Sequence, residues 1–500
     1  MIGARTLLVN PPRIGGIAFT RQGRCQEREE VLGTTKPPFT LALVAALLRA
    51  RGAGEQFKLV DLTARDASVA DLVAELARDD FRPTLIVFPS TTPTLDADVS
   101  ALAPLKARYG AKLVCFGPHA STVPAESMAR APEVDAMLVG EPEDALLQLT
   151  ALGSWDEIDA IPSATYRRGT QVVAARAHGT FRGLAEAPYP AWDLLDLSLY
   201  ALPLVNASYV IVETSRGCPY ACDFCVAPIH QGHKFREKSA TALVDEIEHG
   251  YRTFGLTYFY LWGDTLTLNV KTFSAFCDEL IARQLPIQWF GNARADNLQD
   301  LAFVQRLKRA GCWMLALGIE TESDETRKDM LKRLDGAKIR TAITHMRTAG
   351  VRSFGFFILG YPGETPVNLT KTVDYAIDLD PDFANFYPAV PYPGTELYAK
   401  AKRDGLLASD DWSRMEYSYY LLKGNGLDEP TVMKAINTAK RRFYLRPAYL
   451  ARHAGDITRL AKSKWKVVWH VGSRVVFGAP VAHAEVGDTA RARALASPEA

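Results

Sequence analysis

Three closely spaced cysteines are the residues of this chain whose types and spacing most clearly point to chemistry. Cys218, Cys222 and Cys225 follow a C-x3-C-x2-C pattern in a segment that also holds Gly and Pro. The segment follows the apolar run 209–212, which predicts a buried strand. A zinc site would need a fourth ligand, and no nearby Cys or His completes a familiar zinc pattern. Cubane iron–sulfur clusters are normally held by four thiolates, so three would leave one iron open to a ligand that is not protein.

With Phe224 directly before its last cysteine, this motif resembles that of the radical S-adenosylmethionine (radical SAM) enzymes. The resemblance implies that Cys218, Cys222 and Cys225 hold a [4Fe–4S] cluster whose open iron is chelated by the methionine end of SAM. One electron then cleaves SAM to a 5′-deoxyadenosyl radical, which requires an electron donor such as flavodoxin or ferredoxin. The alternatives are a zinc knuckle or three unrelated buried thiols.

Length and composition predict a globular protein of two or three domains. The chain has 500 residues, of which 48% are hydrophobic and 23% charged. Its net charge of +1 argues against a global field for binding nucleic acid. The N-terminus lacks the apolar core of a signal peptide, and no apolar run is long enough to span a bilayer. Seven cysteines, an odd number, do not indicate a disulfide framework. We expect a cytoplasmic protein.

The first third of the sequence predicts a doubly wound, Rossmann-like α/β domain over residues 1–150. Apolar strand patterns alternate with helical patterns at 41–51, 71–78, 96–109 and 143–149; the strands are expected at 6–10, 58–61, 85–88, 113–116 and 136–139. Ligands of such folds bind at the carboxyl ends of the strands. Those ends carry small or polar residues, which we take as the candidate ligand contacts: Asn10, Pro11, Ser90, Thr91, Gly117, His119, Gly140 and Glu141.

The order of these landmarks resembles the cobalamin-binding domain that precedes the barrel in one large radical SAM class. The resemblance implies that cobalamin lies across this edge of the sheet. The D-x-H-x-x-G signature, whose His ligates cobalt in many cobalamin domains, is absent. We therefore expect His119 to be a loop residue near the corrin and not a cobalt ligand. The alternative is a doubly wound domain that has lost its cofactor.

Residues 208–407 predict a partial (β/α)6 barrel, which is the fold that the radical SAM resemblance implies. Six strands are expected, each followed by a helical pattern, at 209–213, 257–262, 287–292, 313–319, 353–359 and 383–387. The helices are expected at 239–252, 270–284, 299–310, 323–333 with 337–349, and 366–379. Residues 151–207 form a connector that includes a predicted hairpin with its turn near Gly169.

Catalytic groups of such a barrel lie at the carboxyl ends of its strands. The resemblance implies that six residues there or on the cysteine segment contact SAM: Phe224, Gly263, Asp264, Arg294, Glu320 and Ile358. Asp264 would receive the amino group of SAM, and Glu320 the ribose hydroxyls. The fork of donors on Arg294 suits a carboxylate. The alternatives are a plain turn acid for Asp264 and a structural ion pair for Arg294.

Residues 408–478 predict a basic helical region, and residues 479–500 a disordered tail. Basic residues crowd between 434 and 474 with aromatic residues interleaved, and helices are expected at 432–445 and 456–470. This pattern is typical of contact with an anionic membrane surface, here the inner face of the membrane. Nucleic acid is another interpretation of the same charge, although we expect no nucleic-acid partner. The simplest interpretation is a solvated basic face on a cap that packs against the barrel.

Together these features predict an enzyme whose difficult chemistry is done by its cofactors. The resemblance implies that the radical abstracts hydrogen from an unactivated carbon and that methylcobalamin delivers a methyl group. The alternative within enzymes is an oxidative cyclisation or rearrangement, as in the anaerobic cyclase of chlorophyll synthesis. An alternative of another class is a cobalamin or iron–sulfur sensor. A hydrophobic small molecule, isoprenoid or tetrapyrrole, is our hypothesis for the substrate, motivated by the basic aromatic C-terminal region.

Overall fold

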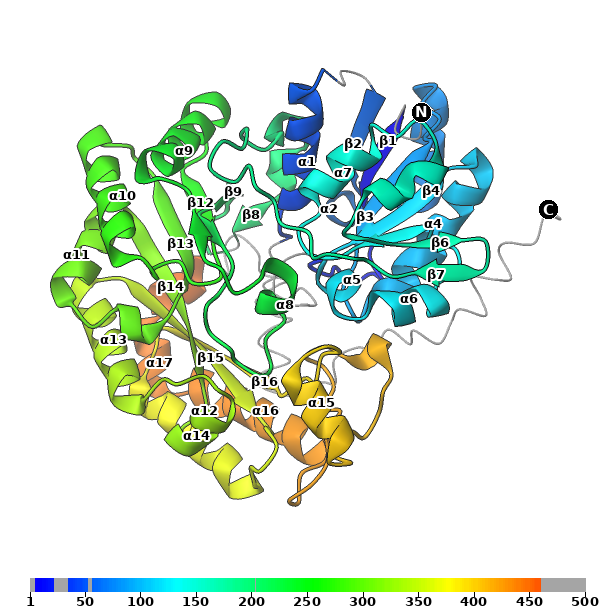
Figure 1. Cartoon of the computed structure of the whole chain (residues 1–500). Coiled ribbons are helices and arrows are strands. Elements are labelled where there is room, and N and C mark those ends of the chain that lie inside the picture. The colour runs from blue at the N-terminus through cyan, green and yellow to red at the C-terminus, as the bar shows by residue number, and fades with distance from the viewer. Residues whose placement is uncertain (1–4, 22–34, 53–55, 203, 460–500) are drawn as a thin grey trace.

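The chain folds around two seven-stranded sheets, each covered by helices. The structure, a computed structural model, describes residues 5–21, 35–52, 56–202 and 204–459. The first sheet has the strand order β2-β1-β3-β4-β5-β6-β7 and the second has the order β16-β15-β14-β13-β12-β9-β8. Figure 1 shows the first sheet in blue and cyan beside the second, whose strands curl into a half-barrel with helices along its outer side.

The first sheet is parallel through its centre and ends in an antiparallel hairpin. Its parallel strands are β1 (Thr6–Asn10), β2 (Phe57–Asp61), β3 (Leu85–Pro89), β4 (Lys112–Phe116) and β5 (Ala136–Leu138). β6 (Ala164–Arg168) and β7 (Gln171–Val173) pair antiparallel. The turn between them holds Gly169 at φ +58°, which a glycine adopts without strain. The hairpin predicted around Gly169 is thereby confirmed, and it extends the first sheet.

Helices cover both faces of the first sheet, as a doubly wound domain requires. They are α1 (Phe39–Ala50), α2 (Leu62–Arg65), α3 (Val69–Arg78), α4 (Leu95–Tyr109), α5 (Pro118–Thr122), α6 (Pro124–Arg130) and α7 (Glu143–Leu149). Leu8 and Val87 point to the face that α1 and α7 cover, whereas Leu7, Val9 and Ile86 point to the face of α3 and α4. Every residue of β1 and β3 is buried, because both faces of a parallel sheet are covered.

The second sheet contains the six parallel strands that the sequence predicts. They are β9 (Ala207–Glu213), β12 (Tyr258–Trp262), β13 (Gln288–Ala293), β14 (Cys312–Glu320), β15 (Arg352–Leu359) and β16 (Phe383–Pro388). The short strand β8 (Ala201–Leu202) joins antiparallel to β9, so β8 and β16 form the two edges and the barrel stays open. The outer helices are α9 (Ala240–Phe254), α10 (Val270–Arg283), α11 (Leu301–Arg309), α12 (Asp324–Asp329), α13 (Gly336–Ala349) and α14 (Pro366–Leu379).

A helical cap follows the half-barrel. It contains α15 (Glu396–Arg403), α16 (Glu429–Tyr444) and α17 (Pro447–Arg452). Short 3-10 helices occur at Trp155–Ala160, Trp192–Leu194, Leu197–Leu199, Ala295–Asn297 and Trp412–Arg414. α16 packs on α14 and β16, and the Phe443 ring is fully buried against Phe386. The aromatic side chain of Phe443 therefore belongs to the protein core.

Three arginines of the cap form ion pairs with the half-barrel. Arg442 pairs with Asp374 at 2.7 Å, and Arg446 and Arg452 both pair with Asp380. This is the arrangement of a basic cap packed on the barrel. Several predictions fall outside the described residues: residues 460–474 of the predicted membrane contact, residues 460–470 of the helix expected at 456–470, and the predicted tail 479–500.

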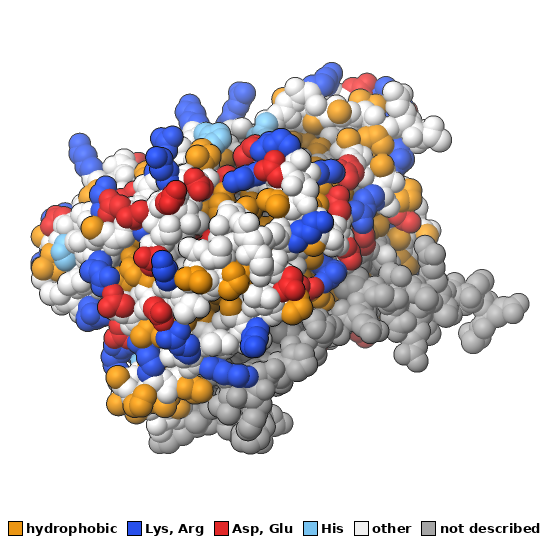
Figure 2. All heavy atoms as spheres, turned by 90° about the horizontal axis from the view of Figure 1, so that it is seen from below, with side chains coloured by type: hydrophobic (Ala, Val, Ile, Leu, Met, Phe, Trp, Pro, Cys, Tyr) orange, Lys and Arg blue, Asp and Glu red, His pale blue; other side chains and the backbone are white. Residues whose placement is uncertain are grey.

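No helix within the described part of the chain is both long and apolar enough to cross a membrane. Figure 2 shows lysine and arginine side chains interspersed with aspartate and glutamate over the face seen from below. The described part of that face therefore carries no large field of one sign.

Candidate active site between the half-barrel and the first sheet

The three cysteines lie on one loop, residues 217–226, which we call the cysteine loop. It runs from β10 (Ser215–Arg216), which pairs with β11 (Arg236–Glu237), to α8 (Ala227–Gln231). Cys218 is buried and Cys222 and Cys225 are half-buried, and all three are free thiols. Gly217 begins the loop at φ +82°, and a Cβ atom there would lie 2.2 Å from the Lys234 carbonyl oxygen, so only glycine fits.

Asp223, between the last two cysteines, anchors this loop to three other segments. Its backbone N–H donates to the Met330 carbonyl at 3.1 Å, and its own carbonyl accepts from the Leu397 N–H at 2.9 Å. Its carboxylate accepts a hydrogen bond of 2.5 Å from the Tyr361 hydroxyl at the end of β15. These bonds position the cysteines relative to the mouth of the half-barrel. The sequence alone assigned no role to Asp223 or Tyr361.

A buried ion pair lies beside Cys222. Lys332 Nζ contacts Glu320 Oε1 at 2.7 Å, and both side chains are buried. Burial acts to lower the pKa of Lys332, but Glu320 and Cys222 outweigh it, so the pKa is raised and the ammonium stays charged. Burial raises the pKa of the Cys222 thiol, and Lys332 and Arg294 oppose that rise. Lys332 was missed by the sequence analysis because it follows α12 in a turn without a recognisable motif.

Glu320 is held in an unusual backbone conformation. It ends β14 at φ +69°, and the pairing of β14 with β15 shifts register between Gly318 and Glu320. A non-glycine residue in this region costs about 1–3 kcal/mol and persists where its surroundings determine it. The irregularity places the carboxylate against Lys332 at the carboxyl end of the strand, where the sequence analysis expects a SAM contact.

Arg294 is already engaged by protein groups. Its guanidinium pairs with Asp296 at 3.0 Å and donates to the Lys332 carbonyl at 3.1 Å. It also stacks on Tyr220 of the cysteine loop, 3.7 Å from the ring centroid. The ion pair that the sequence left open as an alternative is therefore present, and contact with SAM stays a prediction.

The segment after β12 packs against Thr214 and Ser215, which precede the cysteine loop. A Cβ atom on Gly263 would lie 2.6 Å from Ser215 Oγ and 2.7 Å from Thr214 Oγ1, so the packing requires glycine. Asp264 is buried, and Thr265 Oγ1 lies 3.7 Å from Cys218 Sγ. Phe224 and Ile358 are half-buried and pack against the larger hydrophobic core of the protein. The structure thus gathers the predicted SAM residues of β12, β13 and β14 around the loop.

The donor set of the cysteine loop fits an iron–sulfur cluster. Among the described residues, no three side chains of His, Cys, Asp or Glu gather closely enough to hold a single metal ion. A cubane does not need that convergence, because each ligand sulfur binds a different iron. The three free thiols and the two cations near Cys222 suit a cluster whose thiolates carry negative charge.

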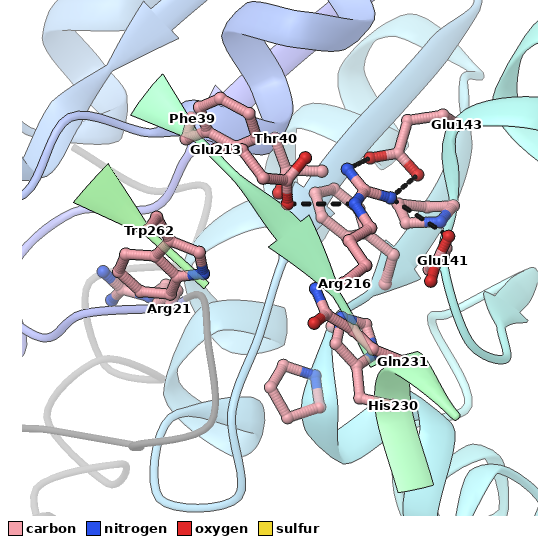
Figure 3. A pocket seen from close by; sticks show the side chains of 14 residues that line it. Arg21, Phe39, Thr40, Glu141, Glu143, Glu213, Arg216, His230, Gln231 and Trp262 are labelled. Carbon is pink, nitrogen blue, oxygen red and sulfur yellow. Dashed lines mark hydrogen bonds and ion pairs between the residues drawn. The ribbon is translucent and has the colours of Figure 1, made fainter. Parts of the chain in front are cut away.

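A pocket lies where the carboxyl edge of the first sheet meets the half-barrel. It has about 470 Å³ of empty volume, part of which is open to solvent. Gly117 and Glu141 line it from the first sheet, and Arg216 and Trp262 from the half-barrel (Figure 3). A neighbouring pocket of about 330 Å³ is lined by Asn10. Three of the predicted cobalamin contacts thus line these two pockets.

Arg216, the residue before the cysteine loop, joins the two domains at this pocket. Its guanidinium contacts Glu213 at 2.9 Å, Glu143 at 2.7 Å and Glu141 at 3.2 Å, and all four side chains are buried (Figure 3). Arg236 pairs with Glu141 as well. Burial would raise the pKa of Glu141, but the two arginines outweigh it and lower that pKa. Burial instead dominates at Glu213 and raises its pKa.

Asn10 and four further predicted cobalamin residues, Pro11, Ser90, Thr91 and Gly140, form hydrogen bonds with neighbouring protein groups. Asn10 Nδ2 donates to Asp61 at 2.8 Å, and the Gly140 N–H donates to Ser121 Oγ at 3.0 Å. Ser90 donates to Asp98 at 3.0 Å, and the Thr91 N–H donates to Thr94 Oγ1 at 3.1 Å. Pro11 accepts from Thr63 Oγ1 at 2.6 Å through its carbonyl. Their contact with cobalamin stays a prediction.

His119 is buried with both ring nitrogens occupied. Nδ1 lies 3.1 Å from Thr92 Oγ1, and Nε2 lies 2.9 Å from Ser127 Oγ. The ring packs edge-on against Trp412 at 4.6 Å between centroids. The expectation of a loop residue is wrong, because Pro118 begins the short helix α5 and His119 lies within it. Both ring nitrogens are engaged by hydroxyl groups here, and the absence of a bond to cobalt stays a prediction.

Acidification is expected to destabilise the first domain through His119. Burial lowers its pKa to about 3, whereas the pKa of histidine in an unfolded chain is about 6.5. The folded protein favours the neutral ring of His119. The contribution of this ring to the free energy of unfolding is therefore fully present above about pH 6.5 and is lost as the pH falls toward the pKa of His119 in the folded protein. At pH 5 the loss is about 2 kcal/mol relative to pH 7.

Urea unfolding of the parent and of His119→Gln at pH 7 and pH 5 measures this effect. The difference between the two pH values is expected to shrink in the variant, which cannot titrate there. The same pH dependence in both proteins would show that His119 is not the group responsible.

Comparison with known proteins identifies the half-barrel. The radical SAM superfamily profile matches residues 212–376, which include the cysteine loop and the strands β12 to β15. These residues are a radical SAM domain, and this part of the chain belongs to the radical SAM superfamily. Membership implies a [4Fe–4S] cluster and SAM as its cofactors, which agrees with the donor set described above. The predictions of the family, the fold and these two cofactors are confirmed.

The whole chain resembles two named proteins in sequence. It is 28% identical over 463 residues to an uncharacterized methyltransferase of Pyrococcus horikoshii, covering 91% of this chain and 97% of that protein. It is 25% identical over 427 residues to the anaerobic magnesium-protoporphyrin IX monomethyl ester cyclase of Cereibacter sphaeroides, covering 84% of this chain and 68% of the cyclase.

The two-domain fold also matches a solved structure. This is the cobalamin-dependent radical enzyme OxsB, solved with aqua-cobalamin and SAM bound. The TM-score is 0.71 at 15% identity, and the match covers 98% of this chain and 75% of OxsB. At this identity the match shows a shared fold: a doubly wound domain followed by a radical SAM half-barrel.

Removing the charge of Glu320 is expected to weaken SAM binding about tenfold or more. A hydrogen bond to a charged group contributes about 1.5–3 kcal/mol, and Glu320→Gln would also leave the buried Lys332 without its counter-charge. Equilibrium dialysis of SAM against the anaerobically reconstituted protein measures the change. Glu322→Gln, at an exposed position on the next turn, is the control and should bind as the parent does. Equal affinity of all three proteins would remove Glu320 from the SAM site.

Proposed function

We propose that this chain is a cobalamin-dependent radical SAM enzyme that methylates an unactivated carbon of a small molecule. The observation that carries the proposal is that the residues flanking the cysteine loop, Arg216 before it and His230 and Gln231 after it, line the pocket at the carboxyl edge of the first sheet (Figure 3). Because Arg216 joins Glu141 and Glu143 of the first domain to the start of the loop, a cofactor at that edge would lie next to the cluster. The sequence similarity to a protein named as a methyltransferase supports the reaction class.

When bound, the cluster with SAM supplies a hydrogen-abstracting radical, and cobalamin supplies a methyl group. The chain's own residues bind and orient these groups. Cys218, Cys222 and Cys225 would hold the cluster, with Lys332 and Arg294 balancing its charge. Asn10, Gly117 and Glu141 would hold cobalamin from the side of the first sheet. An external donor of the flavodoxin or ferredoxin type would supply the electron.

A cyclisation or rearrangement without methyl transfer is the second candidate. The similarity to the protoporphyrin ester cyclase over most of this chain favours it. The half-barrel geometry serves both reactions equally, because both begin with hydrogen abstraction beside the cysteine loop. The two candidates differ in whether cobalamin accepts a methyl group.

Product analysis separates these candidates. The protein is reconstituted with iron, sulfide and cobalamin without air, reduced, and given SAM, and 5′-deoxyadenosine, S-adenosylhomocysteine and methylcobalamin are measured. We expect all three. Deoxyadenosine alone would favour the cyclase-type reaction, and none of the three would contradict enzymatic function and favour a sensor. The same protein without added cobalamin is the control and should form deoxyadenosine but no methylcobalamin.

A further inference from the structure

The inner face of the half-barrel is lined by aromatic side chains. Side chains alternate along β15: Phe354, Phe356 and Ile358 are half-buried, whereas the residues between them are fully buried. One of those buried residues, Phe357, stacks on Phe386, which in turn packs on α16 outside the barrel. The half-buried set therefore points to the inner face.

Neighbouring strands continue this aromatic surface. In the parallel register Phe354 pairs with Phe383 and Ile358 with Tyr387, so these side chains share one face. Phe354 lies 4.8 Å from Phe356 and Phe356 lies 6.0 Å from Tyr387, between ring centroids. Across the sheet, Tyr260 of β12 stacks on Phe290 of β13 at 4.7 Å and contacts Trp262 edge-on at 5.2 Å. Trp262 also lines the pocket next to the cysteine loop.

Charge is scarce on this surface. The strands β13, β15 and β16, which the structure describes throughout, present one charged side chain to it, Arg352 at the amino end. Arg352 pairs with Asp456 at 2.8 Å. The asparagines of the surface bond to its own tyrosines: Asn292 donates to Tyr260 at 3.1 Å and Asn385 to Tyr387 at 2.6 Å. Among the described residues, the cations that contact this surface lie at its ends: Arg352 at one end, and Lys36, whose Nζ lies 5.9 Å from the centre of the Trp262 ring, at the other.

Partly exposed aromatic rings on the inner face of a barrel favour an apolar occupant, because covering their remaining exposed surface is favourable. Tyr387 is already packed on one side against Tyr417 of the cap, at 4.2 Å between ring centroids. The surface is continuous with the candidate active site, since Trp262 precedes Gly263 on the same segment and Ile358 precedes Tyr361, the partner of Asp223. An occupant of the surface would thus end beside the cysteine loop.

We propose that the substrate is a large, uncharged, apolar molecule whose ring-bearing skeleton lies along this aromatic face with one carbon toward the cysteine loop. The inference rests on the proposed function, because it places the reacting substrate in the same half-barrel. It disfavours molecules with a phosphate group placed along β13, β15 and β16, where the middle of this face would leave the charge unpaired.

Binding of 1-pyrenemethanol, a neutral four-ring fluorescent probe, to the anaerobically reconstituted full chain tests the proposal by fluorescence anisotropy. We expect saturable binding of one probe per chain, and about tenfold weaker binding to Phe356→Ala, because one aromatic contact is lost. Phe356→Leu should retain most of the affinity. Tyr189→Ala removes an aromatic ring that is 39% exposed in the connector and should bind as the parent does.

Thermal unfolding of each variant shows whether it is folded as the parent is. Failure of the parent to bind the probe, equal binding by Phe356→Ala, or tighter binding of cytidine 5′-monophosphate than of the probe would each overturn the proposal. Deoxyadenosine formation, measured separately, reports on the proposed function. A parent that cleaves SAM yet ignores the probe refutes only the substrate class.

Discussion

Cys222→Ala is expected to abolish SAM cleavage, with deoxyadenosine formation falling on the order of a thousandfold or more, to background. A cluster held by three protein thiolates loses one of its three anchors, so iron and sulfide should fall with the activity. The variant should remain folded, because the side chain is half-buried and its loop is held independently through Asp223. Iron and sulfide analysis, together with product quantification, measures both effects.

Cys277→Ala is the matched control. Cys277 is also a free thiol, but it is buried in α10 away from the cysteine loop. Loss of its side chain creates a small cavity that lowers the free energy of unfolding by about 1 kcal/mol. We expect the variant to keep its full iron content and activity. Retention of iron and of SAM cleavage in Cys222→Ala would show that this thiol is not a cluster ligand.

The second sheet could be predicted from the sequence because its signal is local. Each strand is a short apolar run followed by a helical pattern, and the motifs that mark the site sit at the strand ends, as with Gly263 after β12 and Glu320 at the end of β14. Such patterns involve residues that are close in the chain, so they can be recognised without knowledge of the fold. The same is true of the cysteine spacing.

Partners distant in the chain could not be predicted. Glu141 was predicted as a cobalamin contact from its place at a strand end, but nothing near it in the sequence shows that Arg216, 75 positions away, binds its carboxylate. The basic C-terminal region was predicted to contact a membrane, and the sequence does not show that two of its cations, Arg446 and Arg452, meet Asp380, 66 and 72 positions earlier. The sequence shows which residues are charged, but it does not show which of them are already paired within the fold.

Arg216→Met is expected to destabilise the protein by about 3–5 kcal/mol, because it leaves buried carboxylates without their shared cation. Glu141 keeps Arg236, but Glu143 and Glu213 lose their bonds to the guanidinium. Cobalamin retention should fall together with stability, since the two domains lose the link at the pocket. Urea unfolding at pH 7 and corrin content after desalting measure these changes.

The pH dependence identifies the cause of that loss. In the variant, the unpaired carboxylates have raised pKa values in the folded protein. Such groups favour the folded state when they are protonated, so the free energy of unfolding of the variant falls as the pH increases. The stability gap between parent and variant should therefore narrow from pH 7 to pH 5. A gap that does not change with pH would mean that lost packing, and not lost charge, explains the effect.

Arg283→Met provides the comparison that isolates burial. Arg283 also contacts three carboxylates, Asp245, Glu248 and Glu279, but its side chain is 26% exposed, against 3% for Arg216. Water can solvate the carboxylates that it leaves, so we expect a loss within about 1 kcal/mol and unchanged corrin content. Equal losses in the two variants would mean that the number of ion pairs matters and the position between the domains does not. A large loss of stability and of corrin confined to Arg216→Met would show that the buried ion-pair network holds the first domain against the segment that begins the cysteine loop.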